Sequence, residues 1–199
     1  MNFIIEKLSE KHLQMLGAFS CIESEKILSK YDSKTRRRIK KHSKEMEDFL
    51  KNESLDEQSK GLNSTRLFID TDTGKVIAYL SLCNDSIRLE IEERDELNLT
   101  YTTVPAIKIA RLAVDSQYQG QGIGKMLIKF AAYMGDKIRQ MSGLVFLTLD
   151  CYEHRVAFYE SVGFVRNIIQ PIELKYDSPI SMRLAIDTYF EKINAEIED

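Results

Sequence analysis

The chain has 199 residues, of which 43% are hydrophobic and 30% charged, a composition that suits one globular domain with a buried core. Its formal net charge of -3 argues against a protein that coats nucleic acid indiscriminately, because such binding needs a positive surface that releases counterions. No apolar run is long enough to span a bilayer and the first residues lack a signal-peptide pattern, so we expect a cytoplasmic protein without a membrane partner.

The first third of the chain predicts a strand followed by helices. Residues 3–8 indicate a first strand, and residues 10–60, which lack proline, indicate a helical hairpin inserted before the rest of the fold. Within that insert lies a dense basic run: Lys34, Arg36, Arg37, Arg38, Lys40, Lys41 and Lys44. A run of this kind is either a solvated helix face or a surface that binds an anionic partner.

The middle of the chain predicts two paired strands, an acidic loop and a central strand. Residues 65–69 and 76–83 are rich in β-branched and aromatic residues and flank a polar turn with glycine near its end, which predicts a hairpin. The acidic stretch after Leu89 (Glu90, Glu92, Glu93, Asp95 and Glu96) indicates a loop or a bulged strand end. Residues 105–114 predict a buried central strand.

The last third predicts alternating helices and strands. Apolar residues recur every three or four positions from Ile123 to Met141, so we expect an amphipathic helix there, followed by a strand at 144–149. A short helix at 152–161 should stop at Gly163 in a left-handed cap, and a strand should start at Phe164. Pro171 and Pro179 flank a loop, and a strand near 181–186 precedes a polar helix at about 188–197.

Three cysteines, Cys21, Cys83 and Cys151, are odd in number and far apart. They form neither a disulfide framework nor a Cys-x-x-Cys metal pair, so we expect buried thiols and no metal. Mixed strands with interspersed helices predict an α/β sheet, in which ligands favour the carboxyl ends of the strands. That rule points to the turn after Val114.

The turn after Val114 joins a buried strand to the start of a helix and is rich in glycine. Small residues let the backbone approach a ligand closely, and the unbonded amides at a helix start supply partial positive charge. Such a site suits phosphate. The spacing fails a Walker A loop, since Gln119 stands where its first glycine should be and Met126 where its hydroxyl should be, and it fails the dinucleotide pattern Gly-x-Gly-x-x-Gly as well.

The pattern that fits is Gln119-x-x-Gly122-x-Gly124, preceded by RLAVDSQYQG. Here the sequence resembles the GNAT superfamily of N-acetyltransferases, whose motif A is Gln/Arg-x-x-Gly-x-Gly/Ala. The resemblance implies an α/β (α+β) fold with a mixed, mostly antiparallel sheet of six to seven strands flanked by helices, splayed after the strand ending near Val114. It also implies acetyl-CoA as cofactor, with the pyrophosphate held by backbone amides at Gln119, Gly120, Gln121, Gly122, Ile123, Gly124 and Lys125. The pantetheine arm would lie along Leu112, Ala113 and Val114 like an added strand.

A second stretch, Ala157 to Phe164, resembles the family's motif B, in which an aromatic pair precedes Gly-Phe. By this resemblance Tyr159 is the general acid that protonates the departing thiolate, and the backbone N–H of Val114 is the donor to the thioester carbonyl. Tyr152 stands where many members carry asparagine, and Asp150 would substitute in contacting the cofactor. The simpler reading of Tyr159 is a packed aromatic beside Phe158.

The acceptor and its base are less defined than the donor. The chain should move an acetyl group to a primary amine by direct attack, and the strand at 105–114 carries no carboxylate to act as base. Glu90, Glu92 and Glu93 could act through water. An α-amine, with a reference pKa near 8 against about 10.4 for lysine, would need less help. The sequence alone favours a small-molecule or protein amine as the acceptor.

Two alternatives stay open. The segments FSC at 19–21, DFL at 48–50 and VIAYLSL at 76–82 resemble bacterial GNAT toxins of toxin–antitoxin pairs, which acetylate the α-amine of aminoacyl-tRNA. That resemblance makes tRNA a candidate partner, which the run from Lys34 to Lys44 would bind through phosphate contacts. The other alternative is a non-catalytic module that binds acyl-CoA. The protein would be a monomer or a homodimer in either case.

Overall fold

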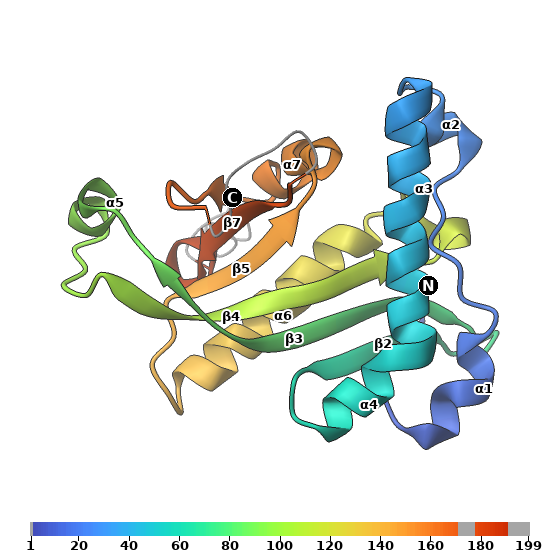
Figure 1. Ribbon diagram of the computed structural model, residues 1–199. Helices are drawn as coiled ribbons and strands as arrows, with labels where there is room; N and C mark the ends of the chain where they lie inside the picture. Colours follow the sequence, from blue (N-terminus) through green and yellow to red (C-terminus); the bar gives the residue numbers. More distant parts are fainter. Residues whose placement is uncertain (1, 171–177, 191–199) are drawn as a thin grey trace, which may run out of the picture. The chain divides into compact units, whose positions relative to one another are not determined.

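The computed structural model describes residues 2–170 and 178–190. Seven strands form one sheet in the order β1-β2-β3-β4-β5-β7-β6 (Figure 1). The pairs β1–β2, β2–β3, β5–β7 and β6–β7 are antiparallel, and the pair β4–β5 is parallel. This mixed sheet with its helices confirms the predicted fold class. The strands are β1 (Phe3–Lys7), β2 (Ser64–Asp70), β3 (Val76–Arg88), β4 (Thr103–Val114), β5 (Phe146–Cys151), β6 (Val165–Arg166) and β7 (Ile180–Ala185).

The chain divides into two compact units. The first unit comprises Met1–Leu82 and Arg111–Leu127, and the second comprises Cys83–Ala110 and Ile128–Asp199. The single domain expected for residues 1–199 stays a prediction. No helix in the described residues is long and apolar enough to cross a membrane.

The hairpin of the first unit forms where its sequence predicted it. β2 and β3 pair antiparallel from Ser64 opposite Leu82, and β1 adds to the other edge of β2 with Phe3 opposite Asp70. The Asp70 carboxylate accepts from the backbone amides of Asp72 and Thr73 and so closes the turn, in which Gly74 has a φ of +67°. Only glycine adopts that conformation without strain.

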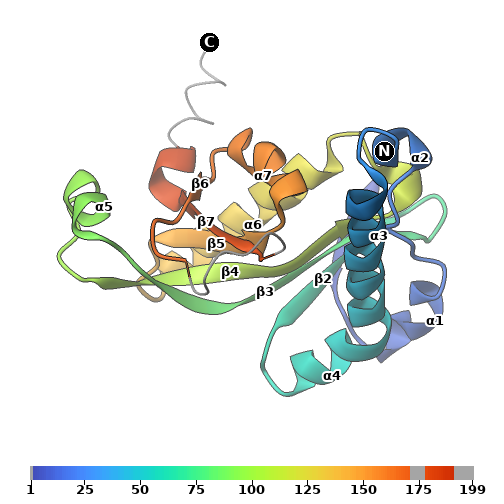
Figure 2. The same ribbon diagram turned by 45° about the horizontal axis from the view of Figure 1, so that its top comes forward.

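The predicted helical hairpin is wrong in detail, because residues 10–60 form several short helices and one long one. These are α1 (Leu13–Leu16), α2 (Glu25–Leu28), α3 (Ser33–Asp48), a wider helical turn at Phe49–Glu53 and α4 (Ser54–Ser59), after a 3-10 turn at Glu10–His12. Asp32 starts α3 by accepting hydrogen bonds from the amides of Lys34 and Thr35. α2 lies beside the N-terminal half of α3 (Figures 1 and 2). The segment between α1 and α2 is not helical, and its backbone groups form hydrogen bonds with the loop after β4.

The core of the first unit gathers around Tyr79 of β3, which is fully buried. Its ring packs edge-on to Phe19 and stacks on Phe49, with centroid distances of 5.6 and 6.2 Å. Its hydroxyl donates to the backbone oxygen of Met46 at 2.8 Å. The C-terminal end of α3 is thereby attached to the sheet through both apolar packing and a hydrogen bond.

The second unit contains the rest of β3 and β4, and strands β5, β6 and β7. β5 pairs with β4 from Ala106 opposite Phe146 to Ile109 opposite Leu149. α6 (Ile123–Arg139), which starts in the first unit, confirms the predicted amphipathic helix as far as Arg139. Met141, counted on its apolar face, lies beyond the helix and is 85% exposed. α7 (Glu153–Glu160) ends before Gly163, whose φ of +98° confirms the predicted left-handed cap.

The prediction for the acidic stretch after Leu89 is wrong, because this stretch forms a helix, α5 (Ile91–Glu96), instead of a loop or strand end. The Glu93 carboxylate accepts from the amide of Glu90 at the start of this helix. Its other oxygen is bound by the Arg183 guanidinium, and both side chains are buried. A charged pair buried in this way holds the helix in place, which the local composition did not indicate.

The end of the chain is only partly described. The strand predicted near 181–186 is confirmed as β7, and the strand expected from Phe164 is reduced to the two residues of β6. Residues 186–190 are helical, and the rest of the helix predicted at 188–197 lies outside the described residues, as do Pro171 and the six positions after it.

Candidate active site

The loop between β4 and α6 has the open geometry that phosphate binding requires. Gly120 and Gly122 have φ values of +76° and +83°, and a side-chain carbon added at either would meet no atom within 4 Å. Both glycines therefore serve the backbone conformation, with free space in front of them. Lys125, in the first turn of α6, is exposed.

The backbone amides of this loop are available to a ligand. Within residues 2–170 and 178–190, no group accepts a hydrogen bond from the N–H groups of residues 119–125. The first regular bond of α6 runs from Met126 N to the oxygen of Gly122. The loop thus presents unbonded donors at the positive end of a 17-residue helix, and these residues fit a diphosphate.

The N-terminal segment holds the start of this loop in place. Ser20 N donates to Asp115 Oδ2 at 3.0 Å, and Ser116 N donates back to the oxygen of Ser20 at 2.7 Å. Gln119 Nε2 donates to the oxygens of Cys21 and Val114 at 3.1 and 3.2 Å. These bonds engage the backbone of Ser20 and Cys21, in a segment that is not helical. They also show that the Gln119 side chain braces the loop, which leaves its backbone amide for the ligand.

The last residues of β4 alternate between two environments. Ala113 is buried in the core of the first unit, whereas Leu112 and Val114 on the other face are only half-buried. Leu112 and Val114 thus present a partly open edge next to the loop. That arrangement suits the role proposed for them along the pantetheine arm.

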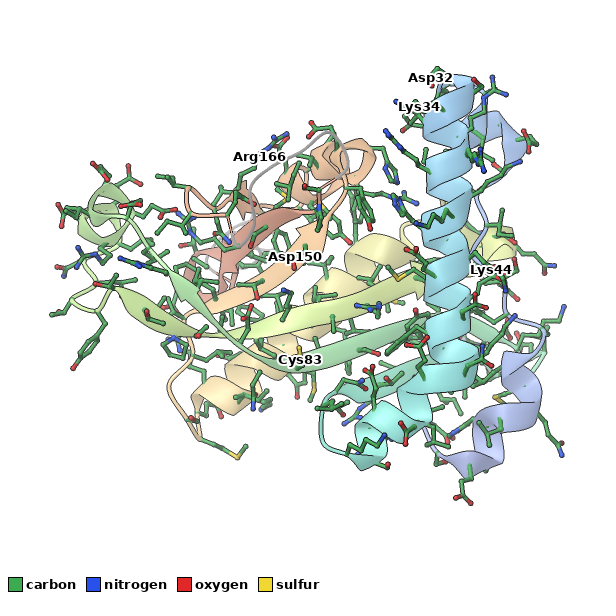
Figure 3. The ribbon with its side chains drawn as sticks, viewed as in Figure 1. Asp32, Lys34, Lys44, Cys83, Asp150 and Arg166 are labelled. Atoms are coloured by element: carbon green, nitrogen blue, oxygen red, sulfur yellow. The ribbon has the colours of Figure 1, made fainter. Side chains whose placement is uncertain are left out.

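The basic run lies on α3 and faces outward. Lys34, Arg37, Lys41 and Lys44 follow at intervals of three and four residues and are exposed, opposite the buried face of Ile39, Ser43 and Glu47. Figure 3 shows Lys34 near the cap Asp32 at one end of α3 and Lys44 farther along the same helix. Lys40, Lys41 and Lys44 pair with Glu25, Glu45 and Asp48, and all six side chains are exposed. Such pairs contribute little stability, so a phosphate can replace the carboxylate.

In the second unit, Tyr159 lies near the C-terminal end of α7. Its ring packs edge-on against Phe158 and Phe164 at centroid distances of 5.0 and 5.6 Å. Removal from water raises the pKa of its hydroxyl to about 12, so the group is protonated at neutral pH. Its aromatic packing agrees with the simpler reading, and its protonation agrees with the role of proton donor.

Asp150, the predicted substitute for asparagine, lies at the end of β5 in an ion pair. Lys108 Nζ is 2.6 Å from Asp150 Oδ2, and the two side chains are 29% and 28% exposed. Its carboxylate is therefore already partnered within the second unit (Figure 3). Of the three acidic residues considered as a base, Glu93 is committed to Arg183, while Glu90 and Glu92 are exposed.

Sequence reasoning found the loop but missed the residues that hold it. Asp115 and Gln119 were part of the recognised stretch, yet their partners Ser20 and Cys21 lie about a hundred residues earlier, in the FSC segment, whose resemblance did not indicate a contact with the loop. Glu47, whose carboxylate binds Ser20 and Cys21, is one acidic residue in a helix of mixed charge. No periodic or spacing signal distinguishes it.

Comparison with known proteins gives three findings. The family described as an acetyltransferase (GNAT) domain matches residues 63–166. A tRNA-acetylating toxin of Mycobacterium tuberculosis (strain ATCC 25618 / H37Rv) is 27% identical over 131 residues, which are 65% of this chain and 77% of the toxin. Two solved structures share the fold. A mutant of KacT has a TM-score of 0.72 at 16% identity, and AtaT complexed with acetyl-methionyl-tRNAfMet has 0.71 at 17%. Each comparison covers 96% of this chain and 99% of the other.

Proposed function

The chain belongs to the GNAT acetyltransferase family, and on that premise we propose that it acetylates the α-amine of an aminoacyl-tRNA. Acetyl-CoA is its cofactor. The tRNA acceptor is favoured over the small-molecule or protein amine that the sequence alone preferred. The observation that carries the proposal is the exposed basic face of α3, attached within the first unit to the glycine loop. The relative named as a tRNA-acetylating toxin and the likeness to AtaT with bound tRNA support it.

The basic face of α3 suits an RNA backbone better than a small amine. Lys34, Arg37, Lys41 and Lys44 extend over eleven residues of helix, a rise of about 15 Å, which spans several phosphates. Contacts of this kind position an RNA without reading its bases. The chain's net charge of -3 restricts such binding to this local surface.

Residues of each unit have proposed roles in the chemistry. Acetyl-CoA supplies the acetyl group as a thioester when bound. In the first unit, the amides of residues 119–125 would hold the diphosphate and the N–H of Val114 would donate to the carbonyl oxygen. In the second unit, Tyr159 would hold at its hydroxyl the proton that the thiolate takes up on leaving. An aminoacyl α-amine has a reference pKa near 8, so a useful fraction is neutral without a strong base.

Two experiments test the proposal. Purified protein with labelled acetyl-CoA should acetylate aminoacyl-tRNA and leave free amino acids and protein amines unlabelled. Expression in bacteria should arrest growth, and Tyr159→Phe should restore it. Labelling of free amines with no labelling of tRNA would contradict the tRNA acceptor and leave the acetyltransferase assignment in place. Binding of acetyl-CoA without transfer to any amine would favour the non-catalytic module instead.

A further inference from the structure

Glu47 is a buried carboxylate on the same helix that carries the basic face. Its side chain is 5% exposed, and Oε1 accepts from Ser20 Oγ at 2.7 Å and from Cys21 N at 2.9 Å. A second bond links the same two elements, because Cys21 Sγ donates to the oxygen of Ser43. Bonds from neutral donors to a buried carboxylate are stronger than bonds between neutral groups, so this attachment is firm.

The residues that Glu47 holds are the ones that hold the glycine loop. Ser20 N donates to the Asp115 carboxylate and the Ser20 oxygen accepts from Ser116 N, while the Cys21 oxygen accepts from the Gln119 side chain. Asp115 in turn accepts from the amide of Gln117 and so shapes the turn that leads to Gly120. A continuous series of hydrogen bonds therefore runs from the buried face of α3 to the start of the loop, all within the first unit.

We propose that Glu47 is a positioning residue for the acetyl-CoA loop, and that it couples this loop to the basic face of α3. The carboxylate does not reach the ligand itself. It holds residues 20 and 21 so that Asp115 and Gln119 keep the loop amides converging on one site. Because α3 carries both Glu47 and the basic face, an acceptor bound on its outer face would act on the same bonds, and the two ligands would affect each other's affinity reciprocally. The coupling to the acceptor rests on the proposed function, whereas the role toward acetyl-CoA does not.

The first test measures acetyl-CoA binding by calorimetry, well below the melting temperature of each variant. Glu47→Ala should weaken binding roughly five- to twentyfold, because the loop loses its support. Glu47→Gln keeps an acceptor oxygen and should stay within about twofold of the parent protein. Thr65→Val is the matched control. It removes buried hydrogen bonds to Asn63 and Ser81 in the same unit but has no link to the loop, so it should lower the melting temperature and leave affinity unchanged.

The outcomes separate positioning from stability. A Glu47→Ala protein that melts earlier but binds acetyl-CoA like the parent protein would overturn the proposal, as would a Glu47→Gln protein that binds as poorly as Glu47→Ala. If Glu47→Ala does not fold, Ser20→Ala removes only the Oγ donor and should weaken binding less, by roughly two- to fivefold. An unchanged affinity there would count against the proposal equally.

The second test measures coupling. Unreactive coenzyme A should change the affinity of the parent protein for aminoacyl-tRNA, and Glu47→Ala should bring the ratio of the two affinities close to one. Equal ratios in the two proteins would overturn the coupling. If the parent protein binds no tRNA at all, the acceptor assignment fails, while the calorimetry still decides the role of Glu47 at the acetyl-CoA loop.

Discussion

The side-chain amide of Gln119 donates a hydrogen bond to the backbone oxygen of Cys21, 3.1 Å away and 98 residues earlier in the chain. The same nitrogen donates to the oxygen of Val114, the last residue of β4. Gln119 therefore joins three segments at one point, and its side-chain nitrogen donates both of these hydrogen bonds within the protein. In the proposed site the diphosphate is held by main-chain amides, which makes the loop's backbone conformation the property to test.

Gly122→Asp should abolish acetyl-CoA binding. It places a carboxylate in front of the loop amides and forces a side chain onto a backbone with a φ of +83°. Gly61→Asp is the matched control, since Gly61 has a φ of +73°, open space around it and no place at the loop. Both variants should lose stability by about 1 kcal/mol, and only Gly122→Asp should lose binding in calorimetry. Equal binding by the two would refute the placement of the site.

Tyr159→Phe should lower kcat by roughly 10² to 10⁴-fold and leave the dissociation constant of acetyl-CoA unchanged. The substitution keeps the ring contacts to Phe158 and Phe164, so the fold should persist. Single-turnover kinetics with saturating cofactor separate the chemical step from binding. A kcat within twofold of that of the parent protein would show that Tyr159 is only a packed aromatic residue and not the proton donor.

Charge reversal on α3 should weaken acceptor binding without changing acetyl-CoA affinity. The triple variant Lys34→Glu, Arg37→Glu and Lys41→Glu removes three exposed positive charges. Its slope of log affinity against log salt should become shallower by about one per lost phosphate contact. Lys60→Glu is the control. Lys60 lies just beyond the end of α4 in the same unit, is exposed and pairs with Asp56, and its reversal should leave the slope unchanged. A slope equal to that of the parent protein in the triple variant would exclude α3 as the RNA-binding surface.

The pH dependence of stability should carry a contribution from Tyr159. Its pKa rises from 10.0 to about 12 on folding, because burial disfavours the ionised hydroxyl. Below pH 10 the group is neutral in both states and its contribution is fully present. Between pH 10 and 12 the unfolded state ionises first, so stability falls as pH rises. Tyr159→Phe should fall less steeply in thermal melts across this range, and identical slopes would contradict the buried hydroxyl.

Much of the fold could be predicted from local pattern. The hairpin around Asp70, the central strand ending at Val114 and the helix from Ile123 all carry strong periodicity or turn chemistry, and all three are present. The predictions failed where a distant partner decides the local conformation. α5 is held by the bond from Arg183 to Glu93, 90 residues apart in the chain, in addition to the local bond from Glu90 N. Residues 19–24 are not helical, and the backbone of Ser20 and Cys21 in this segment binds the loop after β4.

The amino-acid sequence by itself determined the chemistry of the loop, because glycine spacing after a buried strand controls which backbone conformations are accessible to the chain. It therefore pointed to the family that the comparison shows and to the loop that we propose as the acetyl-CoA site. Only the tertiary structure decided what supports that site. The hydrogen bonds of Glu47, Ser20, Cys21 and Asp115 join residues about 25 to 95 positions apart, and no local pattern encodes such contacts. The same folding places the basic residues of α3 on the face opposite Glu47, so that one helix both presents the charge and holds the loop.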